Sequence, residues 1–444
     1  MTAADALGRA CDTVGALDLN RVPPDSIDKA LRIIADCLAV AMAGYRTPPM
    51  AALRRADTAC GLVTAPEERN PFHRSTVWGG GRASAHHAAF LNATAGSFLE
   101  PDEGMRPTGH PGMQIVPAAI AAAEDTHASG ADLLRAVVAG YELSARMFRA
   151  VRLRPHAHPH GHVGALGAAL AVSMLRGTDI RTATAIAATL PLAATWQACY
   201  DGATARNTYM GHAAAIGVRS TELARAGFTG SFASFGVVLG ELLGTGFDEA
   251  ALVDTLRYDA LAVGSGYFKV HSACALTHTA IDAALDIVAA AAPLATEAIT
   301  KVRVDTVAAA RKVDVPAAPN DLSCRFSLSY AVATALATGA SGPAAFRFRA
   351  DIAALAQRVE VHVDPQLEQR WPTCSPARVR VEVDGRILES LVENPTGHPP
   401  RALSRDAHFT KFADAITDPD RARDGWARIM DLPHLPDVNS LLAW

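Results

Sequence analysis

Hydrophobic residues recur along the first 265 residues at the spacing of one helix face. After Pro23 and Pro24, the side chains of Leu31, Ile34 and Leu38 follow at steps of three and four. This period predicts an amphipathic helix. Ala and Gly fill many of the neighbouring positions, which favours close packing between helices. On the same pattern we predict further helices at residues 50–60, 84–99, 115–124, 130–149, 164–175 and 213–226.

The pattern changes near residue 266, beyond which apolar and polar residues begin to alternate. Residues 301–305 and 358–364 alternate as half-buried strands do. Residues 378–387 predict a β-hairpin, because Asp384-Gly385 is a favoured two-residue turn. Helices predicted at residues 327–338 and 348–357 complete an α+β unit.

We therefore predict a mainly α fold of two domains. A large all-α helical domain covers residues 1–265, and a smaller α+β lid domain covers residues 266–396. Residues 397–444 return to the helical domain as a helical tail. The length agrees with this division, because 444 residues are too many for one compact core.

Composition and charge narrow the class of protein. The net charge of −4 leaves no basic surplus for a nucleic-acid backbone. We expect no membrane span, because no uninterrupted apolar run is long enough. The N-terminus lacks the basic start and apolar core of a signal peptide. The seven Cys stand singly with no CxxC pair, so we predict a reduced, cytoplasmic setting.

Residues 100–112 hold the most concentrated candidate chemistry. They contain three carboxylates, one His, three Gly and three Pro. Gly and Pro restrict the backbone path, and Asp, Glu and His supply proton-transfer groups. We interpret the segment as an active-site loop between two helices, with Glu100, Asp102 and His110 as candidates. A solvated surface connection is the alternative.

A second loop, residues 154–162, carries four His at alternate positions. The alternation would put His156, His158, His160 and His162 on one side of a strand, as metal ligands often lie. The Pro and Gly among them favour a loop instead. A metal site, an active-site loop with one or two working His and surface His all stay open.

Two further features suggest binding of an anion. Residues 200–212 form a third loop before a small-residue helix, where Arg206 is either a surface residue or a ligand for a carboxylate. All three loops precede helices, whose free N–H groups favour anions. Lys269 lies between Phe268 and Val270 in a chain that strongly prefers Arg, which suggests a titratable amine. No Gly-rich phosphate loop, GxSxG elbow or HExxH motif is present.

Several short segments, in this order and spacing, resemble the MmgE/PrpD family. That family includes 2-methylcitrate dehydratase, cis-aconitate decarboxylase and iminodisuccinate epimerase. The resemblance implies a helical domain with a lid domain, a homodimer, no metal or organic cofactor, and proton chemistry beside a carboxylate. The segments are residues 31–44, 88–95, 110–112, 140–142, 164–169, 227–230, 269–278 and 326–333.

The resemblance also implies roles for particular residues. His110, His158, Lys269 and Tyr330 match the positions expected to be catalytic, and His110 and Lys269 are the candidate bases. Around them we predict a set of substrate-binding residues, namely Glu100, Asp102, Arg206, Tyr209 and His271.

The chain departs from the family pattern in two places. The family usually has Leu-Asp-Phe-Asp-Asp-Thr before its His-Pro-Gly, where this chain has Leu-Glu-Pro-Asp-Glu-Gly at residues 99–104. The third loop has Arg206 in place of the usual Lys and Tyr209 in place of a His. Arg206 binds anions but cannot serve as a base.

These features predict a cofactor-independent hydro-lyase, similar to 2-methylcitrate dehydratase. It would remove a proton next to a carboxylate, and water, from a small hydroxylated di- or tricarboxylate. A cationic pocket would stabilise the developing charge, and a base with a pKa near 7 would move the proton. The same pocket suits an epimerase of a dicarboxylate such as iminodisuccinate, or a decarboxylase of the cis-aconitate type. An inactive ligand-binding homologue is the remaining alternative.

Overall fold

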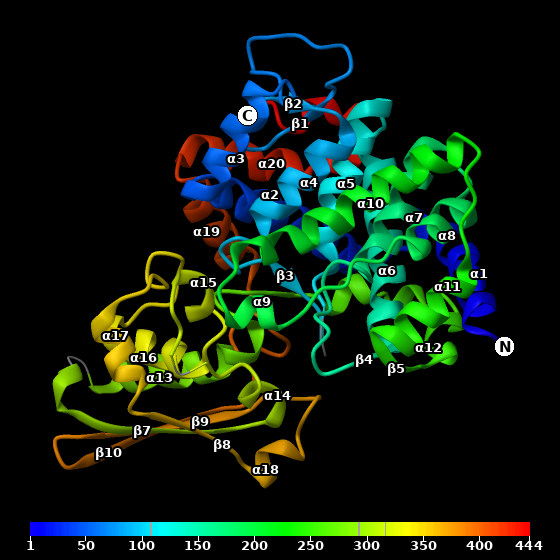
Figure 1. The fold of residues 1–444 in the computed structure, drawn as a ribbon. Coiled ribbons are helices and arrows are strands. Elements are labelled where there is room, and N and C mark those ends of the chain that lie inside the picture. Colours follow the sequence, from blue (N-terminus) through cyan, green and yellow to red (C-terminus); the bar gives the residue numbers. More distant parts are fainter. Residues whose placement is uncertain (107–108, 292–293, 316) are drawn as a thin grey trace.

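Two hydrophobic cores divide the molecule, which we describe from a computed structural model (Figure 1). The structure describes residues 1–106, 109–291, 294–315 and 317–444. The larger core is built from helices of the first 268 residues and from the C-terminal helices. The smaller core lies within residues 273–392. The predicted fold class, mainly helical with a smaller part containing a mixed sheet, is confirmed; the domain limits at 265 and 396 stay a prediction.

Close approach between small residues holds the helical part together. Helix α10 (Thr208–Arg225) packs against both α4 (Ala85–Gly96) and α7 (Gly164–Arg176). A Cβ atom at Gly211 would lie 2.7 Å from the Phe90 carbonyl oxygen, and one at Gly217 would lie 2.4 Å from the Ala168 Cβ. The Ala and Gly of the sequence therefore occupy helix–helix contacts.

The remaining elements of the helical part surround these three helices. They are α1 (Ala3–Gly15), α2 (Pro24–Tyr45), α3 (Pro48–Ala59), β1 (Ser75–Thr76), β2 (Arg82–Ala83), α5 (Pro111–Thr126), α6 (Gly130–Ala150), β4 (Val151–Leu153), α8 (Ile180–Thr189), α9 (Gln197–Tyr200), α11 (Phe232–Val237), β5 (Gly244–Phe247) and α12 (Glu249–Val253).

Helix α4 ends three residues before the predicted limit of 99. The Ser97 hydroxyl donates a hydrogen bond to the Asn207 carbonyl oxygen at 2.8 Å, outside the helix. The chain then leaves the helical direction and continues as the loop that begins at Glu100. The helices α8, α11 and α12 are not among those predicted from the sequence.

A four-stranded mixed sheet forms the base of the smaller part, at the lower left of Figure 1. The strand order is β10 (Arg386–Val392), β9 (Ala377–Val383), β7 (Ile299–Thr306), β8 (Val359–Val363), and only β7 and β8 are parallel. Asp384 and Gly385 have φ of 50° and 71°, as the predicted hairpin turn requires.

The alternation of the strands matches the two faces of the sheet. Val302 and Val304 are buried under the helices of the lid. The other face carries ion pairs such as Lys301–Glu360 at 3.0 Å. The helices of this part are α13 (His278–Ala291), α14 (Ala308–Arg311), α15 (Asp321–Cys324), α16 (Leu328–Thr338), α17 (Ala350–Ala356) and α18 (Pro365–Glu368).

Two segments tie the parts together. Strand β3 (Glu103–Gly104) pairs with β6 (Tyr267–Phe268), so the loop after α4 meets the chain that enters the lid. After the sheet, α19 (Arg405–Ile416) and α20 (Pro419–Met430) return to pack on α2 (Figure 1). Within the described residues, no helix is both long and apolar enough to cross a membrane.

Candidate active site

The short ladder between β3 and β6 creates the candidate site. Glu103 pairs with Phe268, so the next residues along, Asp102 and Lys269, come to lie opposite each other. The Lys269 Nζ lies 3.2 Å from Asp102 Oδ1 and 3.1 Å from Glu100 Oε2. The structure thus brings together the loop of residues 100–112 and the lysine, both identified from the sequence. Residues 107 and 108 of that loop lie outside the described residues.

All three charged groups of this cluster are buried and stay charged. Burial opposes charge on each of them, but the opposite charges nearby outweigh it. The pKa of Lys269 is raised by Asp102 and Glu100, while Arg206 and Lys269 lower the pKa of Glu100. Lys269 also lowers the pKa of Asp102 against burial. Lys269 is therefore held as an ammonium, which disfavours its predicted role as a base.

The Arg206 guanidinium is already paired with a carboxylate of the protein. It lies on a short 3-10 segment (Thr204–Asn207), is buried, and forms an ion pair with Glu100 Oε1. Its guanidinium lies 4.8 Å from the centre of the Phe326 ring. A substrate carboxylate would have to compete with Glu100 for this side chain, so its predicted contact with substrate stays a prediction.

The ring of His110 is oriented by two acceptors on one of its nitrogens. It precedes α5, and its Nδ1 lies 2.9 Å from Asp102 Oδ2 and 2.5 Å from the Glu103 carbonyl oxygen. Since both neighbours are acceptors, Nδ1 carries the hydrogen and Nε2 is left to accept a proton. The His110 side chain keeps 12% exposure, whereas that of Asp102 keeps 1%.

The second loop adds a row of imidazole rings. The His160 ring centre is 4.8 Å from that of His110, and the His158 ring is 4.3 Å from His160. Burial lowers the pKa of both His158 and His160 well below the usual value, so they are neutral. The His160 backbone N–H donates to His158 Nδ1 at 3.2 Å, which leaves the proton of His158 on Nε2.

The four alternate His of this loop do not act together. His156 is exposed, and the His162 Nδ1 hydrogen-bonds the Leu192 carbonyl oxygen at 2.8 Å. In the described part of the chain, no three His, Cys, Asp or Glu side chains are arranged to hold a metal ion. Tyr209 lies at the far end of the row, with its ring 5.9 Å from that of His158.

Two predicted residues lie apart from this cluster. The Tyr330 hydroxyl donates to the Arg347 carbonyl oxygen at 2.8 Å and accepts from the Arg349 N–H at 2.9 Å, within the lid core. His271 contacts Ser341 Oγ at 2.7 Å and Asp282 Oδ1 at 3.0 Å. Across the described residues, no hydrogen bond or ion pair joins either side chain to Glu100, Lys269 or His110.

Glu103 and His398 lie at the site but are not among the predicted site residues. Glu103 is buried beneath it, accepting from the Gly112 N–H at 2.5 Å and the Tyr141 hydroxyl at 3.1 Å. Burial, followed by the charge of Asp102, raises the pKa of Glu103 to about 8. His398 stacks on Tyr267 with 3.6 Å between ring centres. A signal for His398 was present, because Gly-His-Pro occurs both at residues 109–111 and at residues 397–399.

The structure also shows what accompanies Gly104, where the family usually has Thr. A Cβ atom at Gly104 would lie 2.5 Å from the Tyr267 hydroxyl oxygen. The Tyr267 ring is buried, and its centre is 6.4 Å from that of His110. Gly104 therefore leaves room for an aromatic side chain beside the candidate base.

Comparison with known proteins agrees with this two-part arrangement. Residues 9–237 match the MmgE/PrpD N-terminal domain, and residues 271–424 match the MmgE/PrpD C-terminal domain. The chain belongs to the MmgE/PrpD family. Within this family, the loop of residues 100–112 and His158 fall in the N-terminal match, while Tyr330 falls in the C-terminal match.

Two curated relatives carry the same name. The chain is 29% identical to mouse (Mus musculus) cis-aconitate decarboxylase over 235 residues, which is 49% of this chain and 45% of the relative. It is 33% identical to human (Homo sapiens) cis-aconitate decarboxylase over 174 residues, which is 35% of each chain. The matches thus span less than half the length of either MmgE/PrpD relative.

Proposed function

We propose that the protein is a lyase that acts on a small di- or tricarboxylate by proton transfer at a carbon next to a carboxylate. The observation that carries the proposal is the Asp102–His110 pair beside the Lys269 ammonium. Asp102 and the Glu103 carbonyl oxygen both lie beside Nδ1, which leaves Nε2 as the nitrogen that would take the proton. Family membership supports a carboxylate as the substrate.

Among the described residues of the site, two N–H groups could bind an anion. An ammonium has three N–H donors, and two of those on Lys269 are used by Glu100 and Asp102. The third, together with the Nε2–H of His158, would bind a carboxylate of the substrate. Charge that develops on this carboxylate during proton removal would then be stabilised in a buried setting.

Dehydration is the first candidate reaction. His110 Nε2 takes the proton from the carbon next to a carboxylate, and the electron pair forms the new carbon–carbon double bond. The hydroxyl group leaves from the neighbouring carbon and takes up the proton that His110 has gained, so that water is released and His110 is neutral again. A dehydratase similar to 2-methylcitrate dehydratase remains our first expectation for the substrate class.

Decarboxylation is the second candidate, and the name of the two curated relatives favours it. Here the carbon–carbon bond to a carboxylate breaks, carbon dioxide leaves, and the electron pair stays on carbon. Protonated His110 then delivers its proton to that carbon. His110 serves in both reactions. It acts first as a base in dehydration and first as an acid in decarboxylation.

One set of incubations tests these reactions. The purified protein is mixed with citrate, 2-methylcitrate and cis-aconitate, and products are followed by proton NMR. A new alkene from a hydroxylated substrate shows dehydration, and carbon dioxide release from cis-aconitate shows decarboxylation. Incubation in heavy water would show exchange at carbon without net reaction if the protein is an epimerase. If none of the incubations gives a product or exchange but a carboxylate still binds, the lyase proposal is contradicted and a binding protein is supported.

The family resemblance also implies a homodimer, which we propose for this protein. Light scattering during gel filtration would then give a mass of about twice the 46.5 kDa of one chain. A mass of one chain over the concentration range of the activity assay would contradict the dimer.

A further inference from the structure

The backbone at Glu100 has an unusual conformation. Its φ is +66°, in the left-handed region that side chains other than Gly seldom adopt. Such a conformation persists only where its surroundings enforce it. Glu100 is buried, and its carboxylate reaches both Lys269 and Arg206.

Two cations hold the carbonyl groups on either side of Glu100. The Arg325 guanidinium donates to the Leu99 carbonyl oxygen at 3.1 Å, and Lys411 Nζ donates to the Pro101 carbonyl oxygen at 2.6 Å. Arg325 follows α15 in the lid, whereas Lys411 lies on α19. The loop is therefore held in place by side chains from two parts of the chain that are far apart in sequence.

Each cation is itself anchored. Arg325 is buried and also donates to the carbonyl oxygens of Ser272 at 2.8 Å and Phe346 at 3.1 Å. Lys411 lies 2.5 Å from Asp36 Oδ1, which His408 Nε2 contacts at 3.1 Å. Neither cation is a freely moving surface side chain, so each can fix the carbonyl group that it binds.

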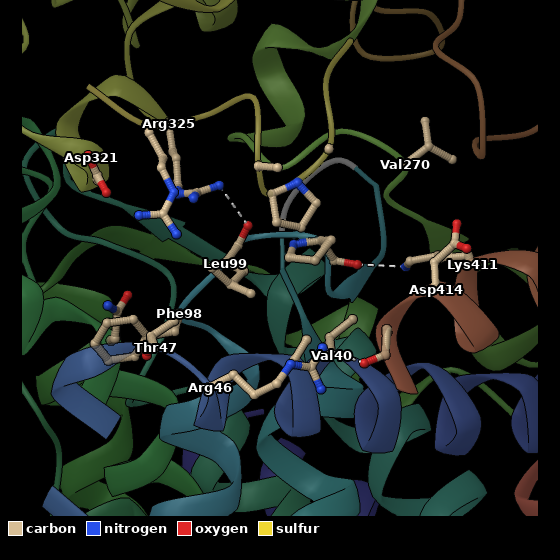
Figure 2. A pocket seen from close by; sticks show the side chains of 18 of the residues that line it. Val40, Arg46, Thr47, Phe98, Leu99, Val270, Asp321, Arg325, Lys411 and Asp414 are labelled. Carbon is tan, nitrogen blue, oxygen red and sulfur yellow. Dashed lines mark hydrogen bonds between the residues drawn. The ribbon is translucent and has the colours of Figure 1, made fainter. Parts of the chain in front are cut away.

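Both cations line a cavity of about 750 Å³ (Figure 2). Phe98, Leu99 and Pro101 form part of its wall, but Glu100 does not. Figure 2 shows the bond from Arg325 to Leu99 as a dashed line, with Lys411 on another side of the cavity. The two cations thus reach the loop from the cavity, while the Glu100 carboxylate contacts Lys269 and Arg206.

We propose that Arg325 and Lys411 are positioning residues for Glu100. By holding the two carbonyl groups, they keep Glu100 left-handed and its carboxylate between Lys269 and Arg206. Without either cation, a partly buried carbonyl loses its partner and the backbone relaxes toward negative φ. Lys269 then loses one of its two carboxylates and shifts away from the reacting carboxylate. The kinetic consequence rests on the proposed lyase function.

Kinetics of Lys411→Ala and Arg325→Ala test the proposal. A small displacement of catalytic groups can cost about 10²-fold in rate, so we expect kcat to fall by at least about tenfold. The cavity is large enough to admit small cations. Ethylammonium should restore turnover to Lys411→Ala, and guanidinium should restore it to Arg325→Ala, while wild type gains nothing. Lost activity without rescue in both variants would contradict a positioning role.

Two other Arg residues that line the same cavity serve as matched controls. Arg46 donates to the Met42 and Ala415 carbonyl oxygens, and the Arg347 side chain is exposed. Within the described residues, no hydrogen bond joins either side chain to residues 98–101. Arg46→Ala and Arg347→Ala should keep wild-type kcat. A loss equal to that of Lys411→Ala would show that total cavity charge matters, and would overturn the proposal.

Crystal structures of the two variants test the positioning without any activity. We expect φ of Glu100 to become negative and the 3.1 Å contact between Glu100 Oε2 and Lys269 Nζ to open. A positive φ and an ion pair kept within about 4 Å in both variants would overturn the proposal. If wild type acts on no carboxylate, the proposed function fails, but these structures still decide the positioning. Should Lys411→Ala not fold, Lys411→Met, which keeps the length of the side chain but has no N–H donor, takes its place.

Discussion

His110 shows how one side chain obtains a role from its neighbours. Its imidazole is directed by Asp102 and by the Glu103 carbonyl oxygen, both contributed by the same loop. Asp102 in turn is kept ionised by Lys269. The proposed base His110 therefore depends on the ion pair between Asp102 and Lys269.

Asp102→Asn tests this dependence. The amide cannot hold the imidazolium that forms during proton transfer, so we expect turnover to fall by about 10²-fold or more. Stopped assays on the substrate identified by NMR would measure kcat, and circular dichroism would check the fold. Turnover within about threefold of wild type would remove Asp102 from the mechanism.

Gly104→Ala tests the contact between the loop and Tyr267. The added methyl group would lie 2.5 Å from the Tyr267 hydroxyl oxygen, so the ring must move. That ring is stacked on His398, and we expect a loss of about 1–3 kcal/mol in stability. Urea denaturation measures the loss. In a Tyr267→Ala background, Gly104→Ala should cost much less stability than it does in wild type, and an equal cost there would place the clash elsewhere.

The raised pKa of Glu103 predicts that the stability of the protein depends on pH. Its pKa of about 8 in the folded protein exceeds the unfolded value of roughly 4.3. The unfolded state therefore gives up its proton first as the pH rises. The stability contributed by neutral Glu103 is complete below the unfolded pKa and is lost as the pH rises toward about 8.

Glu103→Gln should remove this loss, because its amide oxygen can accept from the Gly112 N–H, its NH2 can donate to the Tyr141 hydroxyl oxygen, and it does not titrate. Relative to wild type, we expect the variant to gain on the order of a few kcal/mol between about pH 5 and pH 8. Urea denaturation at several pH values would show a widening difference. A difference that stays constant over this range would contradict a neutral Glu103.

At this scale, part of the candidate site could be predicted from the sequence. Asp102, His110 and Lys269 were identifiable because their residue types carry chemistry in an unusual setting. His160 was not separable from its three alternate neighbours, since the loop path decides which ring lies beside His110. For Tyr330, family order gave the position, but the packing of α16 directs its hydroxyl to the lid backbone.

At the scale of elements, the small residues explain why the helices could be predicted. Gly and Ala repeat along α4, α7 and α10 because these helices approach within contact of each other's backbone. The ends of the helices were harder to predict. Hydrogen bonds from outside the helix, such as Ser97 to the Asn207 carbonyl oxygen, decide where α4 stops.

Gly211→Val tests the contact between α4 and α10. The new Cβ atom would lie 2.1 Å from Thr94 Oγ1 and 2.7 Å from the Phe90 carbonyl oxygen. The backbone cannot yield as a side chain does, so we expect a loss of at least about 2 kcal/mol in the free energy of unfolding. Urea denaturation measures it. Gly240→Val is the control, because a Cβ there meets nothing within 4 Å; equal losses would argue against helix contact as the cause.

At the scale of the molecule, the two large cores meet through polar contacts and a small apolar cluster that includes Cys199, Cys274 and Phe326. Lys312 Nζ donates to the Pro155 carbonyl oxygen at 2.6 Å, and Asn320 Nδ2 donates to the Gly202 carbonyl oxygen at 3.2 Å. The two hydrophobic clusters have no buried residue in common. Cores joined in this way can unfold separately.

We therefore propose that the helical domain and the lid domain unfold in separable steps. Scanning calorimetry should give a measured enthalpy larger than the van't Hoff enthalpy of the main transition. Limited proteolysis near the first transition should cut within one part and leave the other folded. Equal enthalpies and a single loss of both parts would show that the interface couples the cores fully.

The ladder between β3 and β6 bears on how such a protein changes over evolution. The spacing between positions 102 and 269 is set by main-chain pairing at residues 103–104 and 267–268. Side chains around that frame can be exchanged while the frame itself stays in register. Replacements such as Gly104 and Arg206 can then alter the surroundings of the site while the spacing between positions 102 and 269 is kept.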